Sequence, residues 1–258
     1  MRSFKYASVT LAVVFVAAFC AAAQDNNPGN ILAAEFQTPK PGMTQQYEQG
    51  RKQKADWHKQ QKDPSALLVF EIVSGEGTGT YLVARGGLHW ADMDHPSVPE
   101  AADDEEYNKV VGPYVASVND SYYELLPKFG NRDNSPLPPK YSEILSLRVK
   151  FGKDGDFRAA LGKISDAERK VNPSSHVSIF ELVNGGYSGT YVVSFPRPHW
   201  ADFEQDPNAK SIPQALTEVY GADEANSTMA AIDNSIESEY SEILKFRQDL
   251  SYIPAPAK

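Results

Sequence analysis

The sequence predicts an α+β protein made of two copies of one folding unit, joined head to tail. Two segments recur: Phe70-Glu71-Ile72-Val73 returns as Phe180-Glu181-Leu182-Val183, and His89-Trp90-Ala91-Asp92 returns as His199-Trp200-Ala201-Asp202. The spacing is constant (180 − 70 = 110 and 199 − 89 = 110). A period of this length is the size of a domain and too long for a solenoid. Strand and helix patterns also follow in the same order in both copies.

Each copy begins with a short strand, predicted at 31–37 and at 144–151. In the second copy Leu145, Leu147 and Val149 alternate with polar residues. An alternation with period two is typical of a half-buried strand.

A turn that contains glycine follows, and then a helix. Phe157, Leu161 and Ile164 of the second copy fall at helical spacing, which predicts an amphipathic helix with one face on a sheet. Tyr47 takes the matching place in the first copy, within a polar stretch. We interpret His58 in this stretch, and His176 ahead of a later strand, as surface residues.

Next comes a hairpin, with strands predicted at 66–73 and 80–84 in the first copy and at 177–183 and 190–195 in the second. Glycine-rich turns join the strands. A loop that binds phosphate would lead from a strand into a helix, whereas here strand follows strand. The glycines therefore predict hairpins and not a nucleotide site.

A second helix is predicted from Glu106 to about Tyr123, and from Glu218 to about Tyr240. Last strands follow at 124–129 and 242–246. The order is strand, helix, strand, strand, helix, strand, the ferredoxin-like unit. A sheet covered by helices on one face must bury its other face, and a second identical unit is the economical cover.

Residues 1–23 have the pattern of a secretory signal peptide. Basic residues precede an apolar run from Ala7 to Phe19, and Ala21-Ala22-Ala23 is a cleavage signature. The run is short for a membrane span and no stop-transfer charges follow it. We expect cleavage before Gln24, export to the periplasm or the medium, and no stable membrane insertion afterwards. A retained anchor or a lipidated Cys20 is the alternative.

The predicted domains are a first unit at 24–134, a proline linker at 135–140 and a second unit at 141–258. Cleavage would remove the only cysteine and two basic residues, which leaves 23 Lys and Arg against 34 Asp and Glu (23 − 34 = −11). Disulfides and cysteine-ligated metals are then excluded. Nucleic acid is not expected as a partner either, because phosphate binding needs clustered Lys and Arg.

These elements resemble the dimeric α/β-barrel superfamily, which includes antibiotic-biosynthesis-type monooxygenases, haem-degrading enzymes, stress-responsive barrel proteins and NIPSNAP-like proteins. The resemblance rests on Lys40-Pro41-Gly42-Met43 leading to Tyr47, its echo at Gly152 and Phe157, the Gly-Thr-Tyr strand of the hairpin, and the Trp-Ala-Asp segment. It implies two ferredoxin-like units packed sheet on sheet as an intramolecular barrel, either a monomeric pseudo-dimer or a higher homo-oligomer.

The repeated histidines are the main candidates for chemistry. If each motif begins a helix, His89 and Asp92 flank its amino terminus, and either the imidazole or the carboxylate can cap backbone N–H groups. Alternatively, the imidazole is a proton donor or acceptor, or a haem ligand. The acidic residues nearby predict no metal site, and no cofactor is assigned.

Tyr81 and Tyr191 lie on hairpin strands, where each phenol is either a ligand contact or a hydrogen-bonded core residue. No catalytic residue of the superfamily can be carried over, because no Asn is placed identically in both copies and the repeated Trp falls after the hairpin. The candidate ligand-binding residues are therefore His89, Trp90, Asp92, His199, Trp200, Asp202, Tyr81 and Tyr191.

We expect an exported protein that binds a small apolar ligand in a barrel cavity. The alternatives are a cofactor-independent monooxygenase, a haem-handling enzyme, and a structural or interaction protein.

Overall fold

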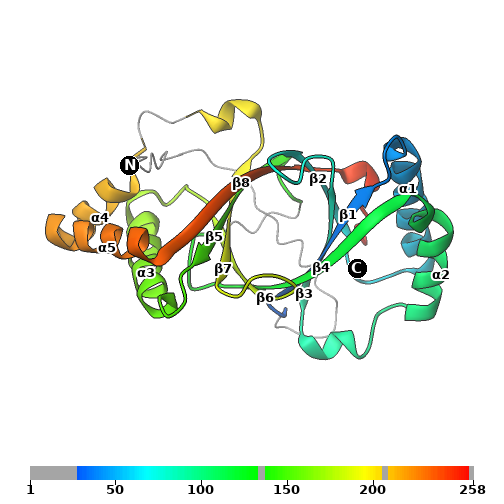
Figure 1. The fold of residues 1–258 in the computed structure, drawn as a ribbon, viewed down its shortest axis with the longest axis horizontal. Coiled ribbons are helices and arrows are strands. Elements are labelled where there is room, and N and C mark those ends of the chain that lie inside the picture. The colour runs from blue at the N-terminus through cyan, green and yellow to red at the C-terminus, as the bar shows by residue number, and fades with distance from the viewer. Residues whose placement is uncertain (1–27, 133–136, 205–208, 256–258) are drawn as a thin grey trace. The chain divides into compact units, whose positions relative to one another are not determined.

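The computed structural model describes residues 28–132, 137–204 and 209–255. The predicted signal peptide and part of the proline linker lie outside these residues. Within them the chain forms eight strands and five α-helices, and the strand pairs are antiparallel (Figure 1). The predicted α+β class, with two ferredoxin-like series of elements in tandem, is confirmed.

The first series runs from β1 to β4. Its elements are β1 (Ile31–Pro39), α1 (Thr44–Gln61), β2 (Leu68–Ser74), β3 (Tyr81–Leu88), α2 (Glu100–Val110) and β4 (Val115–Leu125). The second series runs from β5 to β8, and its second helix is divided in two at Gly221. Its elements are β5 (Tyr141–Val149), α3 (Asp154–Val171), β6 (Ser178–Asn184), β7 (Thr190–Arg197), α4 (Ile212–Tyr220), α5 (Ala222–Ser235) and β8 (Ile236–Phe246).

Equivalent elements keep the sequence offset of 110 residues. The bounds of β1 and β5, of α1 and α3, and of β2 and β6 differ by this number at both ends. Both hairpins also share one register, because Glu71 lies opposite Tyr81 and Glu181 lies opposite Tyr191. The predicted hairpins are therefore confirmed, and a position in one series can be compared directly with its counterpart.

The prediction of long second helices is wrong at their carboxyl ends. The first was expected to reach Tyr123, but α2 ends at Val110, and β4 then pairs with β1 along nearly its whole length. The second was expected to reach Tyr240, but α5 ends at Ser235. Neither strand alternates clearly between polar and apolar residues. Pairing with a neighbouring strand, and not local pattern, decides their conformation.

The chain divides into two compact units, and each contains a short segment from the other series. The N-terminal unit holds β1 to β4 and also the chain from Glu242 onward. There the Arg247 N–H donates to the Val69 carbonyl at 2.8 Å, and Leu67 pairs with Tyr252.

The C-terminal unit holds Leu125–Leu182 and Tyr187–Ser241, which include β5, β7, α3 to α5 and most of β6. The Leu126 N–H donates to the Ile179 carbonyl at 2.8 Å, and Asn131 pairs with Val177. Since Ile179 and Val177 are the counterparts of Val69 and Leu67, the exchange is reciprocal. The predicted domain boundaries, which assume contiguous units, stay a prediction.

In each unit a long helix packs on the sheet, α1 in the N-terminal and α3 in the C-terminal unit (Figure 1). The core under α3 is apolar and includes Leu147, Phe157, Leu161, Ile179 and Val193. Among the described helices, none is both long and apolar enough to cross a membrane.

Candidate functional site

The buried face of α1 is mostly polar. Its inward residues are Tyr47, Gly50, Arg51, Lys54 and His58, which lie three or four positions apart and share one side of the helix. Arg51 and Lys54 are each only 2% exposed, and His58 is 0% exposed. Charged side chains are almost never buried to this degree unless they are paired.

The counterpart face of α3 is apolar at most of the same positions. Phe157, Leu161 and Ile164 stand where α1 has Tyr47, Arg51 and Lys54. The same helix surface is therefore built from hydrocarbon in one unit and from charged and hydroxyl groups in the other.

The strand under α1 shows the same replacement. Glu35 and Gln37 lie on β1, where β5 has Leu145 and Leu147. The Tyr47 hydroxyl donates to Oε1 of Gln37 at 2.8 Å, and both side chains are fully buried. Strand and helix thus carry matched polar groups at their contact.

Helix α2 also contributes to these buried polar surroundings, beside α1 and β1. Lys54 Nζ lies 3.1 Å from Oδ1 of Asp103 and donates to the Asp103 carbonyl at 2.6 Å. The two helices approach closely at Gly50, where a Cβ atom would lie 1.9 Å from the Val110 carbonyl oxygen. Burial lowers the pKa of Lys54, and Asp103 opposes that shift. We call these surroundings the polar core, made of Glu35, Gln37, Tyr47, Arg51, Lys54, Asp103 and Tyr107.

Electrostatics couple the members of the polar core. Burial raises the pKa of Glu35, the Arg51 guanidinium opposes the shift, and Asp120 on β4 adds to it. Burial also raises the pKa of Tyr107 to about 12, with a contribution from Glu35. The core therefore holds a carboxyl group whose ionised form is less favoured than in water, beside a guanidinium that is always charged.

Several buried polar atoms of the polar core make no hydrogen bond with the part of the chain that the structure describes. Two of them are donors, Nε of Arg51 and Nε2 of Gln37. Oδ1 of Asp103 also lacks a hydrogen bond of normal geometry, but it forms the ion pair with Lys54 Nζ. A buried donor without an acceptor costs about 1–3 kcal/mol. Buried polar groups in folded proteins nearly always have a hydrogen-bond partner in the protein or in an ordered water, so an unmatched pair of donors needs an explanation.

The prediction that His58 is a surface residue is wrong. Its Nδ1 lies 2.9 Å from Oδ2 of Asp63, and its ring stacks on Tyr252. The burial was hidden in the sequence because Tyr252 belongs to the exchanged C-terminal segment. His176 is half-buried.

Asp63 is the centre of a hydrogen-bonded cluster around His58. The Ser65 N–H and the Ser97 hydroxyl both donate to Oδ1 of Asp63. Burial acts to raise the pKa of Asp63, but the hydrogen bonds and the Arg85 charge lower it to about 2. Ser97 contacts the carboxylate and not the imidazole, so these residues lack the order of a nucleophilic triad.

The repeated His-Trp-Ala-Asp motifs form two short 3-10 helices, Trp90–Met93 and Trp200–Phe203. Oδ2 of Asp92 accepts a 2.7 Å hydrogen bond from the His89 backbone N–H, and Asp202 does the same for His199. The carboxylates therefore cap the helices, as one of the two predicted alternatives states.

The aromatic residues of these motifs lie at the surface. Trp90 is 49% exposed and contacts Tyr122, while Trp200 is 55% exposed and contacts Tyr141. His89 and His199 are exposed as well. The motifs are thus placed at the ends of β3 and β7, and the structure does not bring their imidazoles into the polar core.

Tyr81 and Tyr191 are hydrogen-bonded core residues. The Tyr81 hydroxyl donates to Oε1 of Glu48 at 2.6 Å, and the Tyr191 hydroxyl donates to Oδ1 of Asp154 at 2.5 Å. Their rings contact Tyr47 and Phe157, both with centroids 4.7 Å apart. Burial raises the pKa of both phenols.

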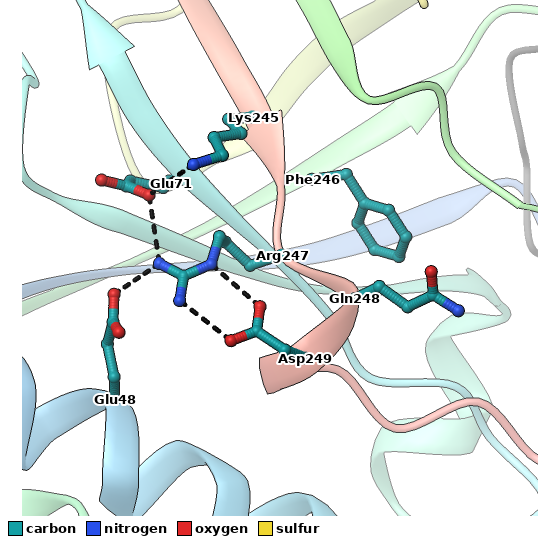
Figure 2. Close-up of a pocket in the computed structure, with 7 residues that line it drawn as sticks. All are labelled: Glu48, Glu71, Lys245, Phe246, Arg247, Gln248 and Asp249. Carbon is teal, nitrogen blue, oxygen red and sulfur yellow. Dashed lines mark hydrogen bonds and ion pairs between the residues drawn. The ribbon is translucent and has the colours of Figure 1, made fainter.

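An open hollow of about 830 Å³ lies beside Glu48 and is occupied by an ion-pair network (Figure 2). Arg247 pairs with Glu48, contacts Glu71 at 3.1 Å, and binds both carboxylate oxygens of Asp249 at 2.9 and 3.0 Å. Since the guanidinium is already paired with three carboxylates, we interpret this hollow as a structural junction that ties the exchanged segment to the unit.

The chain has no match among protein-family models, and none among curated proteins. Solved structures do match. The chain resembles two proteins described as candidate monooxygenases, from Fusobacterium nucleatum (TM-score 0.57, 8% identity, 89% of this chain and 97% of that one) and Lactobacillus acidophilus (TM-score 0.54, 8% identity, 88% and 97%). It also resembles an anthrone oxidase-like protein (TM-score 0.51, 9% identity, 84% and 91%). At these identities the likeness shows the fold alone.

The repeated motifs do not reveal the polar core, because its residues do not recur in the second series. A comparison of the two series at the offset of 110 residues would have found it. Positions that are apolar in the second series become polar in the first, as at Leu145 and Glu35 or Leu161 and Arg51.

Proposed function

We propose that the protein binds a small organic molecule in its N-terminal unit, at the polar core. One observation carries this proposal: the C-terminal unit builds the same helix-on-sheet contact with Leu145, Leu147, Leu161 and Ile164. The fold therefore does not need charged groups there. Burying charges costs free energy that only good pairing repays, and apolar replacements are often neutral or stabilising. Groups retained against that cost are candidates for function.

Chemically, the polar core can orient a ligand and exchange a proton with it. Arg51 and Gln37 offer unpaired donors to an oxygen atom, and Glu35 offers a carboxyl group. Glu35 and Tyr107 are half-buried and Asp120 is exposed, so the core reaches solvent on the β4 side. The sequence predicted a small apolar ligand. We still propose a small ligand, but one that carries a polar group.

Monooxygenase activity is the second candidate. Its support is the fold likeness to two proteins described as candidate monooxygenases. In this chain, the oxidation would act on the molecule held at the polar core.

Two further proposals concern an internal duplication of the chain and its export. The matched registers and the offset of 110 residues support an internal duplication. The pattern of residues 1–23 supports export with a mature amino terminus at Gln24. Amino-terminal sequencing of the protein from its own host tests the second proposal, and an intact Met1 would contradict it.

The binding proposal is tested by native mass spectrometry of protein purified from its own host. A triple variant, Gln37→Leu, Tyr47→Phe and Arg51→Leu, gives the N-terminal unit the residues of its counterpart. We expect a small molecule on the wild type and none on the triple variant.

The matched control is the double variant His89→Asn and His199→Asn, since Asn caps helices as well as other polar residues. It should retain the molecule. A wild type without any bound molecule, or a triple variant that still carries it, would overturn the proposal. Loss of the molecule in the histidine control would move the site to the repeated motifs.

A further inference from the structure

We infer that the ligand enters the polar core through a carboxylate group, which Arg51 and Gln37 bind together. This inference rests on the proposed function and adds the chemical class of the ligand to it. Both side chains are more than nine-tenths buried, and each has a nitrogen without a hydrogen-bond partner among the described residues.

The free groups are donors, and this identifies the ligand group as an acceptor. Oε1 of Gln37 already accepts from the Tyr47 hydroxyl, so only the NH₂ end of the amide is left to meet a ligand. This amide lies close enough to Glu35 to lower its pKa, although Nε2 makes no hydrogen bond of normal geometry. Arginine has only donors. A neutral ligand donor would find no acceptor at these two nitrogens.

The charge around these donors favours a monoanion. Lys54 is paired with Asp103, whereas no ion pair joins Arg51 to any described carboxylate. A planar carboxylate matches the fork of a guanidinium. A phosphate would bring more negative charge toward Glu35, Asp103 and Asp120, which all lie on the surrounding elements. The observations therefore favour a carboxylate over a phosphate.

The rest of the ligand is expected to be apolar or aromatic. Tyr47 belongs to the core cluster that includes Val69 and Val83, and the partly buried Tyr107 packs against this cluster. Rings of this kind provide flat apolar surface with polar edges. A small aromatic carboxylic acid combines both requirements.

The test is isothermal titration of the full mature chain with matched probes: benzoate against benzamide, and phenylacetate against phenylacetamide. Each amide has the shape of its acid but no charge. We expect at least one carboxylate to bind, and its amide to bind at least tenfold more weakly. Arg51→Lys should weaken carboxylate binding about tenfold or more, because it removes the guanidinium fork, and Arg51→Leu should abolish it.

The control variant is Arg148→Gln, which changes a partly exposed arginine on β5 in the other unit and should leave binding unchanged. Equal binding of acid and amide, no binding of either acid, or unchanged binding by Arg51→Leu would overturn the inference. Failure of this inference can be distinguished from failure of the proposed function. A neutral molecule found by mass spectrometry on the wild type, and lost in the triple variant, would keep that function while excluding a carboxylate ligand.

Discussion

Tyr47 and Gln37 form a buried hydrogen bond of 2.8 Å that has no equivalent at the matching place in the other unit. Their counterparts, Phe157 and Leu147, are hydrocarbon side chains in an apolar core. The pair therefore shows how one scaffold accepts either two apolar residues or two polar ones. A pair of one polar and one apolar residue at these two positions should give the least stable protein.

Tyr47→Phe alone should destabilise the protein. It removes the donor to Oε1 of Gln37 and leaves that oxygen buried without this hydrogen bond, at a cost of about 1–3 kcal/mol. The double variant Tyr47→Phe and Gln37→Leu should recover most of the loss, because it recreates the Phe157 and Leu147 pair. Urea unfolding of the wild type, of the single variants Tyr47→Phe and Gln37→Leu, and of the double variant measures the coupling between the two side chains. Equal stability of the single and double variants would show that Gln37 does not depend on Tyr47.

The reverse substitution in the C-terminal unit, from an apolar to a charged residue, should reduce stability far more. Leu161→Arg places a charge among Leu147, Phe157, Ile179 and Val193. A buried charge without a partner costs several kcal/mol, so we expect a loss of about 3 kcal/mol or more. Arg51→Leu should cost much less. Thermal unfolding of both variants makes the comparison, and equal losses would mean that the polar core is needed for folding.

The sequence predicted the elements whose pattern is local. The hairpins follow from β-branched residues around glycine turns, and the Asp92 cap follows from its spacing to His89. The length of α2 could not be predicted, because β4 is a strand only through its pairing with β1. The burial of His58 depends on Tyr252, which lies almost two hundred positions later and joins the unit by exchange.

The candidate site could be predicted only by comparison between the two series. Arg51 and Lys54 lie in a stretch rich in Lys and Gln that reads as a solvated helix surface. Only their counterparts Leu161 and Ile164 reveal that this face points inward. The unpaired atoms of Arg51 and Gln37 depend on side-chain positions, which no sequence pattern contains.

Asp63→Asn should destabilise the N-terminal unit in a manner that depends on pH. The pKa of Asp63 is lowered from 3.8 to about 2, so its ionised form is favoured in the folded state. The stability from this shift, about 2 kcal/mol, is present above pH 3.8 and is lost as the pH falls through 2. Urea unfolding should therefore show a larger difference from the wild type at pH 6 than at pH 3. Ser97→Ala, which removes one hydrogen bond to Asp63, should have a smaller effect. A difference independent of pH would contradict the role of the carboxylate charge.

Glu35→Gln should stabilise the protein at neutral pH. The raised pKa of Glu35 means that the folded state holds the proton more tightly than the unfolded chain, whose ordinary value is 4.5. The stability linked to this group is present below pH 4.5 and is lost as the pH rises through the folded pKa. Glutamine avoids that loss because it carries no charge. Melting temperatures should thus be higher for the variant at pH 7 and similar for both proteins at pH 4. A variant that is less stable at pH 7 would show that Arg51 needs the Glu35 charge.

The exchanged C-terminal segment should control the stability of the N-terminal unit. Tyr252 exchanges backbone hydrogen bonds with Leu67 at 2.8 and 2.9 Å, its hydroxyl donates to the Asp63 carbonyl at 2.6 Å, and Leu250 is buried in the same core. Leu250→Ala should cost about 2–4 kcal/mol, the usual loss for a leucine in a core. Hydrogen exchange measured by mass spectrometry should show that Leu250→Ala speeds exchange, relative to the wild type, more in α1 and β2 than in α3 and β6.

Leu126→Ala is the matched change in the other direction, because Leu126 joins the core of the C-terminal unit. It should speed exchange first in α3 and β6, since those elements pack on the segment that begins at Leu125. Each variant should therefore act mainly on the unit that receives its segment, and not on the series that precedes it in the chain. If Leu250→Ala instead loosened α3 before α1, the reciprocal exchange would be the wrong account of how the two units are completed.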